Sequence, residues 1–474
     1  MVASFSQSKQ QNQTLAQGAP TQADTKRRQT MQLAWKSYRG ELQDPLKVAQ
    51  GQPNDNVKVN RCAPIADKSV SFLFNQTLKI ECDDQDDLDA IWGDDDDKMV
   101  RLVKLATNGV VCGQTFVKLI PQEDTYPRMV VLNPMNVRII TLPDDCDRHI
   151  AYIIEYPLGS QLQKRQIIAR VDPNRELDEL EDQDIQDTWT ITNYTRKGDS
   201  GNWMQKGVLQ EWNYPFPPVF TCQNHIDPNE AWGLPSLSPD LIEMNKVLNF
   251  ILSNIARIIK YHGHPKTWVK GIRAGQIQIA VDETVVLESD NAAIGALAAM
   301  ENFAGLLSVV DDLRSSMDEL SGVSAFALGR LRELPKGNIS GVALRLLFQS
   351  LIEKTILKQR LYGKLIREVS RAALVLCGAI SVEEYANYPI KLHWQNLLPE
   401  DDLAAAQTAL LLQQLGVSID TLLQQLGYNS KDEVKKTQDE AAQKLQNSTQ
   451  EPDQLQLPGQ PPMQQGQEQQ GAAA

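Results

Sequence analysis

Two heptad-patterned segments of similar length, separated by about 40 residues, constrain the fold more than any other feature of the sequence. In the first, residues 237–258, apolar side chains recur at alternating steps of four and three, as on a helix that buries one face. The second, residues 303–320, repeats the pattern. A short insert between matched rods favours an antiparallel pair with the insert at one tip. The residues predicted to form the seam are Leu241, Met244, Leu248, Ile251, Ile255, Phe303, Leu306, Val310, Leu313 and Met317.

The first helix has recognisable end signals. Ser238 can cap its start, Pro239 suits the first helical position, and Gly263 followed by Pro265 stops it. A third and much longer helix is predicted over residues 341–378, about 55 Å if straight.

Apolar residues also lie off the seam of both heptad helices. This width predicts that the pair is buried on more than one side, and therefore packs against further helices. The off-seam residues are Val247, Phe250, Ile259, Leu307 and Val309.

The charge of the chain is unevenly distributed. The net charge is −13, so the chain as a whole is not a basic nucleic-acid binder. Residues 330–371, however, carry ten Lys or Arg against three Glu, while residues 81–97 carry ten acids and no base. The basic stretch either contacts an anionic partner such as DNA or pairs with acids of this chain or a neighbouring one.

The cysteines and the lengths of the apolar runs indicate the cellular compartment of the protein. The six cysteines show no CxxC or metal-ligand spacing, which predicts reduced thiols. The N-terminus lacks an apolar signal region, and no apolar run reaches the roughly 18 residues that span a bilayer. We therefore expect a soluble intracellular protein with no membrane contact.

The remaining pattern predicts an α+β fold. Segments rich in β-branched and aromatic residues follow one another between residues 110 and 221, which predicts an antiparallel meander. A further strand near 389–397 is expected to join that meander. Residues 59–82 indicate a helix running into a strand, and residues 86–105 a continuous amphipathic helix.

The two ends of the chain have the composition of unpacked segments. Residues 1–30 are predicted to be a disordered arm because Gln, Ser and Thr dominate them. Residues 446–474 hold ten Gln and four Pro and are predicted to be a disordered tail.

The sequence carries no catalytic motif of a common class. There is no Walker A loop, GxGxxG, GxSxG or HExxH. His262 and His264 could begin a metal site, but without a third ligand nearby a role at the helix end is favoured. Asp94–Asp97 could chelate a cation, but a run of carboxylates is more often solvated. We predict no enzyme activity, metal or cofactor.

Several stretches resemble the portal proteins of tailed bacteriophages. NEAWGLPSLSPDLIEMNKVLNFILSNI is similar to that family's run into its first stem helix, and GHPKTWVKG to its passage from stem to clip. SGVSAFALG, followed by Ser-Gly-Val-Ala-Leu at Ser340–Leu344, resembles the family's tunnel loop and long helix. ADKSVSFLFNQTLKI resembles an early family stretch, although Asn75 replaces the usual Gly. The likeness covers residues 30–440, and the order of the motifs makes it fairly specific.

The resemblance implies a portal-type fold: a β-rich wing, a two-helix stem, a small α/β clip, a long tunnel helix and a helical crown. Mapped onto this sequence, the parts are the arm 1–30, wing 31–235, stem helices 236–262 and 301–322, clip 263–300, tunnel loop 323–340, long helix 341–378, wing strand 379–398, crown 399–445 and tail 446–474.

The resemblance also implies a function. Family members form a homododecameric ring at one capsid vertex, the channel for packaging and ejection of double-stranded DNA. Such a ring docks the terminase large subunit and later a head–tail connector or adaptor protein, and it contacts the major capsid and scaffolding proteins. It is assembled in the host cytoplasm and ends in the virion.

Two groups of residues are predicted to carry this function. Arg330, Arg332 and Lys336 on the tunnel loop are expected to touch DNA phosphates without reading sequence. Clip docking is expected to use Lys266, Trp268, Lys270 and Arg273.

Two other classes of protein remain open at this point. One is another virion structural protein, a coat or scaffold, although matched rods with a tip insert argue against both. The other is a metal-dependent nuclease that uses Asp83–Asp97 in a two-metal manner. That enzyme would require Mg²⁺-dependent cleavage that is lost when these acids become Asn.

Overall fold

A computed structural model describes residues 14–397 except 49, 52–53, 75–76, 124, 143, 160, 176–181, 199–200, 264–266, 271–292, 297–303 and 331–340, together with 411–413. The chain divides into two compact units, Met1–Leu397 and Leu398–Ala474. Of the second unit, which contains the predicted crown and tail, only residues 411–413 are described.

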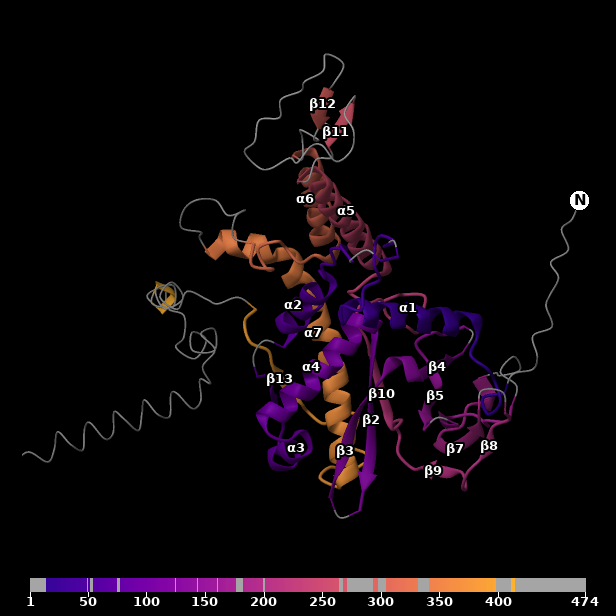
Figure 1. The fold of residues 1–474 in the computed structure, drawn as a ribbon. Helices are drawn as coiled ribbons and strands as arrows, with labels where there is room; N and C mark the ends of the chain where they lie inside the picture. Colours follow the sequence, from indigo (N-terminus) through magenta and orange to yellow (C-terminus); the bar gives the residue numbers. More distant parts are fainter. Residues whose placement is uncertain are drawn as a thin grey trace, which may run out of the picture. The chain divides into compact units, whose positions relative to one another are not determined.

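The first unit mixes helices and strands, as the α+β prediction requires (Figure 1). Its helices are α1 (Gln22–Tyr38), α2 (Cys62–Leu73), α3 (Gln85–Trp92), α4 (Asp95–Cys112), α5 (Pro239–Gly263), α6 (Ala304–Ser321) and α7 (Gly341–Cys377). Its strands are β1 (Lys79–Glu81), β2 (Gln114–Gln122), β3 (Thr125–Leu132), β4 (Val137–Thr141), β5 (His149–Leu158), β6 (Leu162–Ala169), β7 (Trp189–Lys197), β8 (Met204–Gln205), β9 (Gln210–Trp212), β10 (Val219–Gln223), β11 (Thr267–Lys270), β12 (Ala293–Ala296) and β13 (Lys391–His393).

The strands of the described ranges pair antiparallel throughout. One sheet has the order β10-β2-β3, and a larger one has β4-β5-β6-β7 with β8 and β9 both pairing with β7. Between residues 110 and 221 the predicted meander is therefore confirmed, but it is divided between two sheets.

The main core lies between the three-stranded sheet and the helices. The C-terminal part of α7 contacts β2, β3 and β10, and it also contacts α2 (Figure 1). Tyr362, Leu365 and Val369 of α7 are almost fully buried there. The long helix is thus a central element of the fold, and burial of its apolar face is the main force that fixes it.

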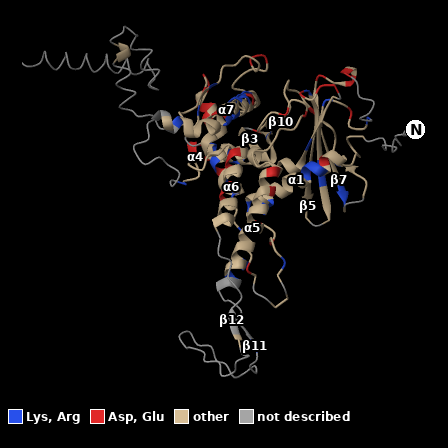
Figure 2. Ribbon diagram, turned by 90° about the horizontal axis from the view of Figure 1, so that it is seen from above, with Lys and Arg blue, Asp and Glu red and all other residues tan. Residues whose placement is uncertain are grey.

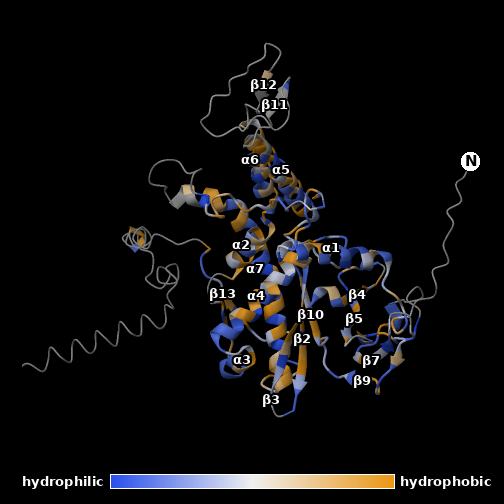
Figure 3. Cartoon of the chain, in the orientation of Figure 1, coloured by the Kyte–Doolittle hydropathy of each residue, from blue (hydrophilic) through white to orange (hydrophobic). Residues whose placement is uncertain are grey.

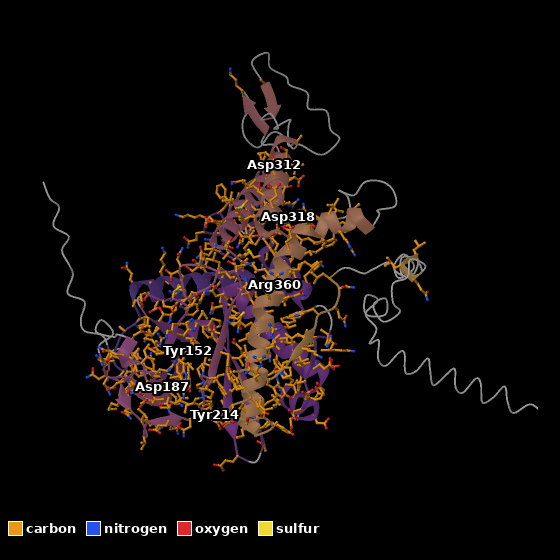
Figure 4. The ribbon with its side chains drawn as sticks, turned by 180° about the vertical axis from the view of Figure 1, so that it is seen from behind. Tyr152, Asp187, Tyr214, Asp312, Asp318 and Arg360 are labelled. Carbon is orange, nitrogen blue, oxygen red and sulfur yellow. The ribbon has the colours of Figure 1, made fainter. Side chains whose placement is uncertain are left out.

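Strand alternation gives the six-stranded sheet two buried faces. In β5, Tyr152 and Ile154 belong to the main core, whereas Ala151 and Ile153 belong to a second, separate apolar cluster. Figure 4 labels Tyr152, whose ring stacks on that of Trp189 at 6.0 Å between centroids. Both faces are covered because side chains of a strand point to opposite sides in turn.

The N-terminal arm differs from its prediction. Leu15 and Ala16 are each 1% exposed, and α1 begins at Gln22. The segment from Thr14 onward is packed because its backbone carbonyl groups accept hydrogen bonds from buried arginines, a contact that composition does not reveal.

Two further predictions need correction. The helix expected over 86–105 is two helices, α3 and α4, because Gly93 adopts a φ of 80° between them. Strand β13 does not join the meander; it pairs with β1, so that Leu392 lies opposite Ile80. That pairing places the strand beside residues 79–81, where the acidic stretch begins.

Candidate functional site

The two heptad helices, α5 and α6, contact each other, and their bounds lie close to the predicted ones. Ser238 Oγ accepts a hydrogen bond from the Leu241 amide at 3.3 Å and so caps α5. Of the seam residues, Leu241, Leu248, Ile255, Val310 and Met317 are buried, and Met244, Ile251, Leu306 and Leu313 are half-buried. Phe303 lies outside the described residues.

A second face of α5 binds an extended segment that leads into α2. The side-chain oxygens of Asn245, Asn249 and Ser253 accept hydrogen bonds from the amides of Arg61, Val59 and Val57, at 3.0, 2.9 and 2.9 Å. All three polar side chains are almost fully buried. The sequence analysis missed this contact, although polar residues at steps of four along the helix were its signal.

The third face of α5 leaves large apolar side chains in contact with solvent. Val247 is 41% exposed and Phe250 is 49% exposed. On α6, Leu307, Val309 and Leu320 are exposed as well. Figure 3 shows hydrophobic residues along both helices. The sequence predicts that apolar residues off the seam pack against further helices. In the single chain these side chains are exposed instead.

The polar surface of α6 is acidic. Asp311, Asp312 and Glu319 are exposed, and Arg314, which pairs with Asp311 at 3.1 Å, is the one Lys or Arg within this helix. Figure 4 labels Asp312 and Asp318 on α6. A surface of this sign repels a polyanion rather than holding it.

Asp318 forms the centre of a partly buried cluster with two arginines. Its side chain is 7% exposed, Arg61 Nη2 lies 2.5 Å from Oδ1, and Arg330 Nη2 pairs with Oδ2. Burial raises the pKa of Asp318, and the two guanidinium groups oppose that rise. The cluster joins the end of α6 to the residue before α2 and to the turn at 325–329.

The predicted DNA-facing and docking residues are placed only in part. The guanidinium of Arg330 is engaged with Asp318, whereas Arg332 and Lys336 lie outside the described residues. Lys270 is exposed at the end of β11, and Trp268 lies opposite Gly295 of β12. Lys266 and Arg273 are not among the described residues. Both predicted groups therefore stay predictions.

The predicted basic stretch lies largely on α7, where Lys and Arg are blue in Figure 2. One of its lysines is not on the surface. Lys358 is buried, and its Nζ donates to Ser69 Oγ at 2.7 Å and to Ser236 Oγ at 2.8 Å. This contact ties α7 to α2 and to the residues just before α5.

Burial of this lysine changes its ionisation. Burial, assisted by the charge of Lys354, lowers the pKa of Lys358 to about 7. His225 Nε2 lies 3.0 Å from the same Ser236 Oγ, and burial together with Lys358 lowers the pKa of His225 to about 4. Both effects follow from removing a cation from water.

The family to which the chain belongs follows from a comparison with known protein families. The family described as "Phage portal protein, SPP1 Gp6-like" matches residues 21–447, which is most of the chain. The chain is a member of this phage portal protein family. The resemblance seen in the sequence is thereby confirmed, and the family is structural rather than enzymatic. A portal protein is a component of the phage particle.

Three solved structures contain chains similar to this portal chain. One is described as "Virion of native gene transfer agent (GTA) particle", with a TM-score of 0.47 and 13% identity. The others are "Neck of native GTA particle computed with C12 symmetry", with 0.44 and 12%, and "Neck of empty GTA particle computed with C6 symmetry", with 0.47 and 12%. Each match covers 77% of this chain and 90% of the other chain. No curated protein matches the portal chain.

Part of the acidic stretch of the portal chain has a structural role. This role accounts for Asp94–Asp97 without the metal-dependent nuclease activity that was the alternative interpretation. Asp94 caps α4, since its Oδ1 accepts from the Asp97 amide at 2.7 Å, and Asp95 to Asp97 occupy the first helical turn, where carboxylates are favourable. The ranges that the structure describes contain no group of three or more His, Cys, Asp or Glu arranged to hold a metal ion. Within the same ranges no helix is long and apolar enough to cross a bilayer.

Replacing Lys358 with Met is expected to flatten the dependence of portal stability on pH. The folded pKa of about 7 lies below the unfolded value, so the unfolded chain binds one more proton between about pH 7 and 10. Wild-type unfolding free energy therefore gains up to about 1.4 kcal/mol per pH unit from this group as the pH rises through that window. Chemical denaturation at pH 7, 8 and 9 measures this slope. Lys364→Met, at an exposed site on α7, is the matched control, and parallel profiles for wild type and Lys358→Met would contradict the account.

Proposed function

We propose that this portal chain assembles into a twelve-subunit ring at one capsid vertex, around a channel for double-stranded DNA during packaging and ejection. The observation that carries the proposal is the exposed apolar surface of α5 and α6, above all Phe250 and Val247, beyond their shared seam. Neighbouring helix pairs set side by side would bury it. A head-to-tail interface of this kind closes into a ring when its rotation closes. Assembly would take place in the host cytoplasm.

The charges of the chain suit a conduit through which DNA slides. The acidic side chains of α6, among them Asp311 and Asp312, would repel phosphates along the predicted stem. The tunnel loop 323–340 would carry basic residues that touch the backbone without reading bases. Attraction at the tunnel loop and repulsion along the stem would keep the DNA in the channel while it can still slide.

The insert between α5 and α6 would bind the partner proteins of packaging and tail attachment. Within residues 263–300, β11 and β12 pair as antiparallel strands. We assign this clip to the terminase large subunit during packaging and to a head–tail connector or adaptor protein afterwards. The predicted contacts are Lys266, Trp268, Lys270 and Arg273. The major capsid and scaffolding proteins would contact the rest of the ring.

The double substitution Arg332→Ala and Lys336→Ala is expected to reduce the amount of DNA retained in filled particles while rings still form. Removing two phosphate contacts weakens the binding of DNA, and the difference from wild type shrinks as salt is raised, because the variant releases fewer counterions. Particles assembled with the variant are measured for encapsidated DNA at two salt concentrations.

The single substitution Arg330→Ala separates the two roles of the loop. Because Arg330 pairs with Asp318, its loss is expected to lower chain stability more than either of the other two changes. Lys364→Ala, which removes an exposed lysine from α7, serves as the control for net charge. Unchanged DNA content and unchanged salt sensitivity in the double variant would exclude the loop contact.

A further inference from the structure

The outer face of the six-stranded sheet forms an apolar cluster separate from the main core. Two alanines face each other across β5 and β6, because Ala151 pairs with Ala169, and the next pair on the same face is Ile153 with Ile167. The side chains of the first pair are small and those of the next pair are large, and all four residues are buried. Leu15 and Ala16 belong to this cluster and are each 1% exposed.

Beside this cluster, three arginines share one carboxylate. Arg138, Arg165 and Arg28 all reach Glu155, at 3.2, 2.6 and 3.0 Å. Arg165 is 1% exposed, and its desolvation lowers its pKa to about 10. One carboxylate cannot accept from all the N–H groups of three guanidiniums, so the buried arginines need further acceptors.

The N-terminal segment supplies those acceptors from its backbone. Arg165 Nη1 donates to the Ala16 carbonyl at 2.8 Å, and Nη2 donates to the Gly18 carbonyl at 2.9 Å. Arg138 Nη1 donates to the Ala19 carbonyl at 3.3 Å. Charge-assisted hydrogen bonds of this kind are stronger than neutral ones.

One side chain of the segment is also recognised. The Gln17 amide donates from Nε2 to the Trp203 carbonyl at 2.9 Å and accepts from the Trp203 amide at 3.1 Å. The segment itself forms a turn, because the Gly18 amide donates to the Thr14 carbonyl at 2.7 Å. The Arg165 guanidinium carbon lies 4.2 Å from the centroid of the Trp203 ring. This cation–π contact helps to fix the guanidinium that binds the turn.

We propose that this sheet face is a peptide-binding site, and that the segment Thr14–Gly18 of a portal chain is its ligand. Selectivity comes from an apolar residue in the cluster that contains the alanine pair, a glutamine that pairs with the backbone of residue 203, and a turn that presents carbonyls to buried arginines. The segment is bound as a ligand rather than as a strand, since it adds only a single β-bridge at Thr14 and no strand to the sheet, and it joins α1 through Ala19–Thr21. The site takes the same segment from a second copy when its own is displaced.

The test uses full-length chains and a fluorescent peptide of residues 14–21. A chain carrying Leu15→Asp and Gln17→Ala releases its own segment, and it is expected to bind the wild-type peptide at least about tenfold more tightly than the wild-type chain does. The wild-type site is already filled by a tethered ligand at high effective concentration. Fluorescence anisotropy measures the binding.

Two changes in the site are expected to abolish this binding in the released chain. Ala151→Leu enlarges a buried side chain of the cluster without altering charge, and Arg165→Met removes the guanidinium that donates to the carbonyls of the segment. Leu158→Ala, at an exposed position of β5, is the control. If Leu15→Asp with Gln17→Ala lowers the yield of folded chain, Gln17→Ala alone replaces it.

Either of two results would overturn the proposal. One is that the folded, released chain binds the peptide no better than wild type does. The other is that it binds a Leu15→Asp peptide equally well. Neither result bears on ring formation, which does not require this site.

Discussion

Replacing Asp318 with Ala is expected to lower the free energy of unfolding by about 3 kcal/mol. The change leaves Arg61 and Arg330 close together without their shared carboxylate, and the Arg61 side chain is 14% exposed. Removing one member of a buried ion cluster lowers stability by more than the whole cluster contributes to it, because the remaining charges stay desolvated. The value lies at the low end of that range because Arg330 is 28% exposed and can reach water.

The control for this prediction lies on the same helix. Asp312→Ala removes an exposed carboxylate of α6 and is expected to change stability by less than about 0.5 kcal/mol. Arg61→Met combined with Asp318→Ala should recover part of the loss, because one uncompensated cation is gone. Denaturant unfolding at a fixed chain concentration measures all three. Equal stabilities for Asp318→Ala and Asp312→Ala would show that the cluster does not hold the end of α6.

Replacing Phe250 and Val247 together with Asp is expected to convert rings into single chains. In the proposed ring these side chains pass from about half exposed to buried, and each carboxylate placed there would have to be desolvated. A loss of at least about 3 kcal/mol per interface corresponds to a more than 100-fold weaker association of neighbours. Sedimentation velocity at matched concentration measures the change.

The matched control for this change adds charge elsewhere on the pair. Ser308→Asp combined with Ser315→Asp places the same two charges on the exposed surface of α6 and is expected to leave rings intact. The stability of the single chain should hardly change in either variant, because both sites are exposed before assembly. Intact rings in the double variant would mean that this surface is not the interface.

Periodicity alone makes the helix pair predictable. Alternating steps of three and four over residues 237–258 can be satisfied only by a helix with one buried face, and α5 and α6 have that form. The antiparallel strands are predictable for the same reason, since alternation and turn residues are local signals. The family resemblance rests on the order of several weak motifs, and a match over residues 21–447 confirms it.

The features that escaped prediction depend on contacts between distant residues. The segment Thr14–Gly18 is held chiefly through carbonyl groups, which every residue has, so its polar composition suggested disorder. Arg330 looked like a free cation in a basic loop, because nothing near it in sequence announces Asp318 as its partner. Strand β13 is three residues long, and its partner β1 lies about 310 residues earlier, too far for any local pattern to indicate.

The most direct test of the proposed ring is the mass of the purified wild-type chain in native buffer, with negative-stain images of the same sample. The proposal predicts particles of roughly a dozen subunits with a central hole, because closure of a head-to-tail interface leaves no free apolar surface on α5 and α6. A single species with the mass of one or two chains at micromolar concentration, and images without rings, would contradict it.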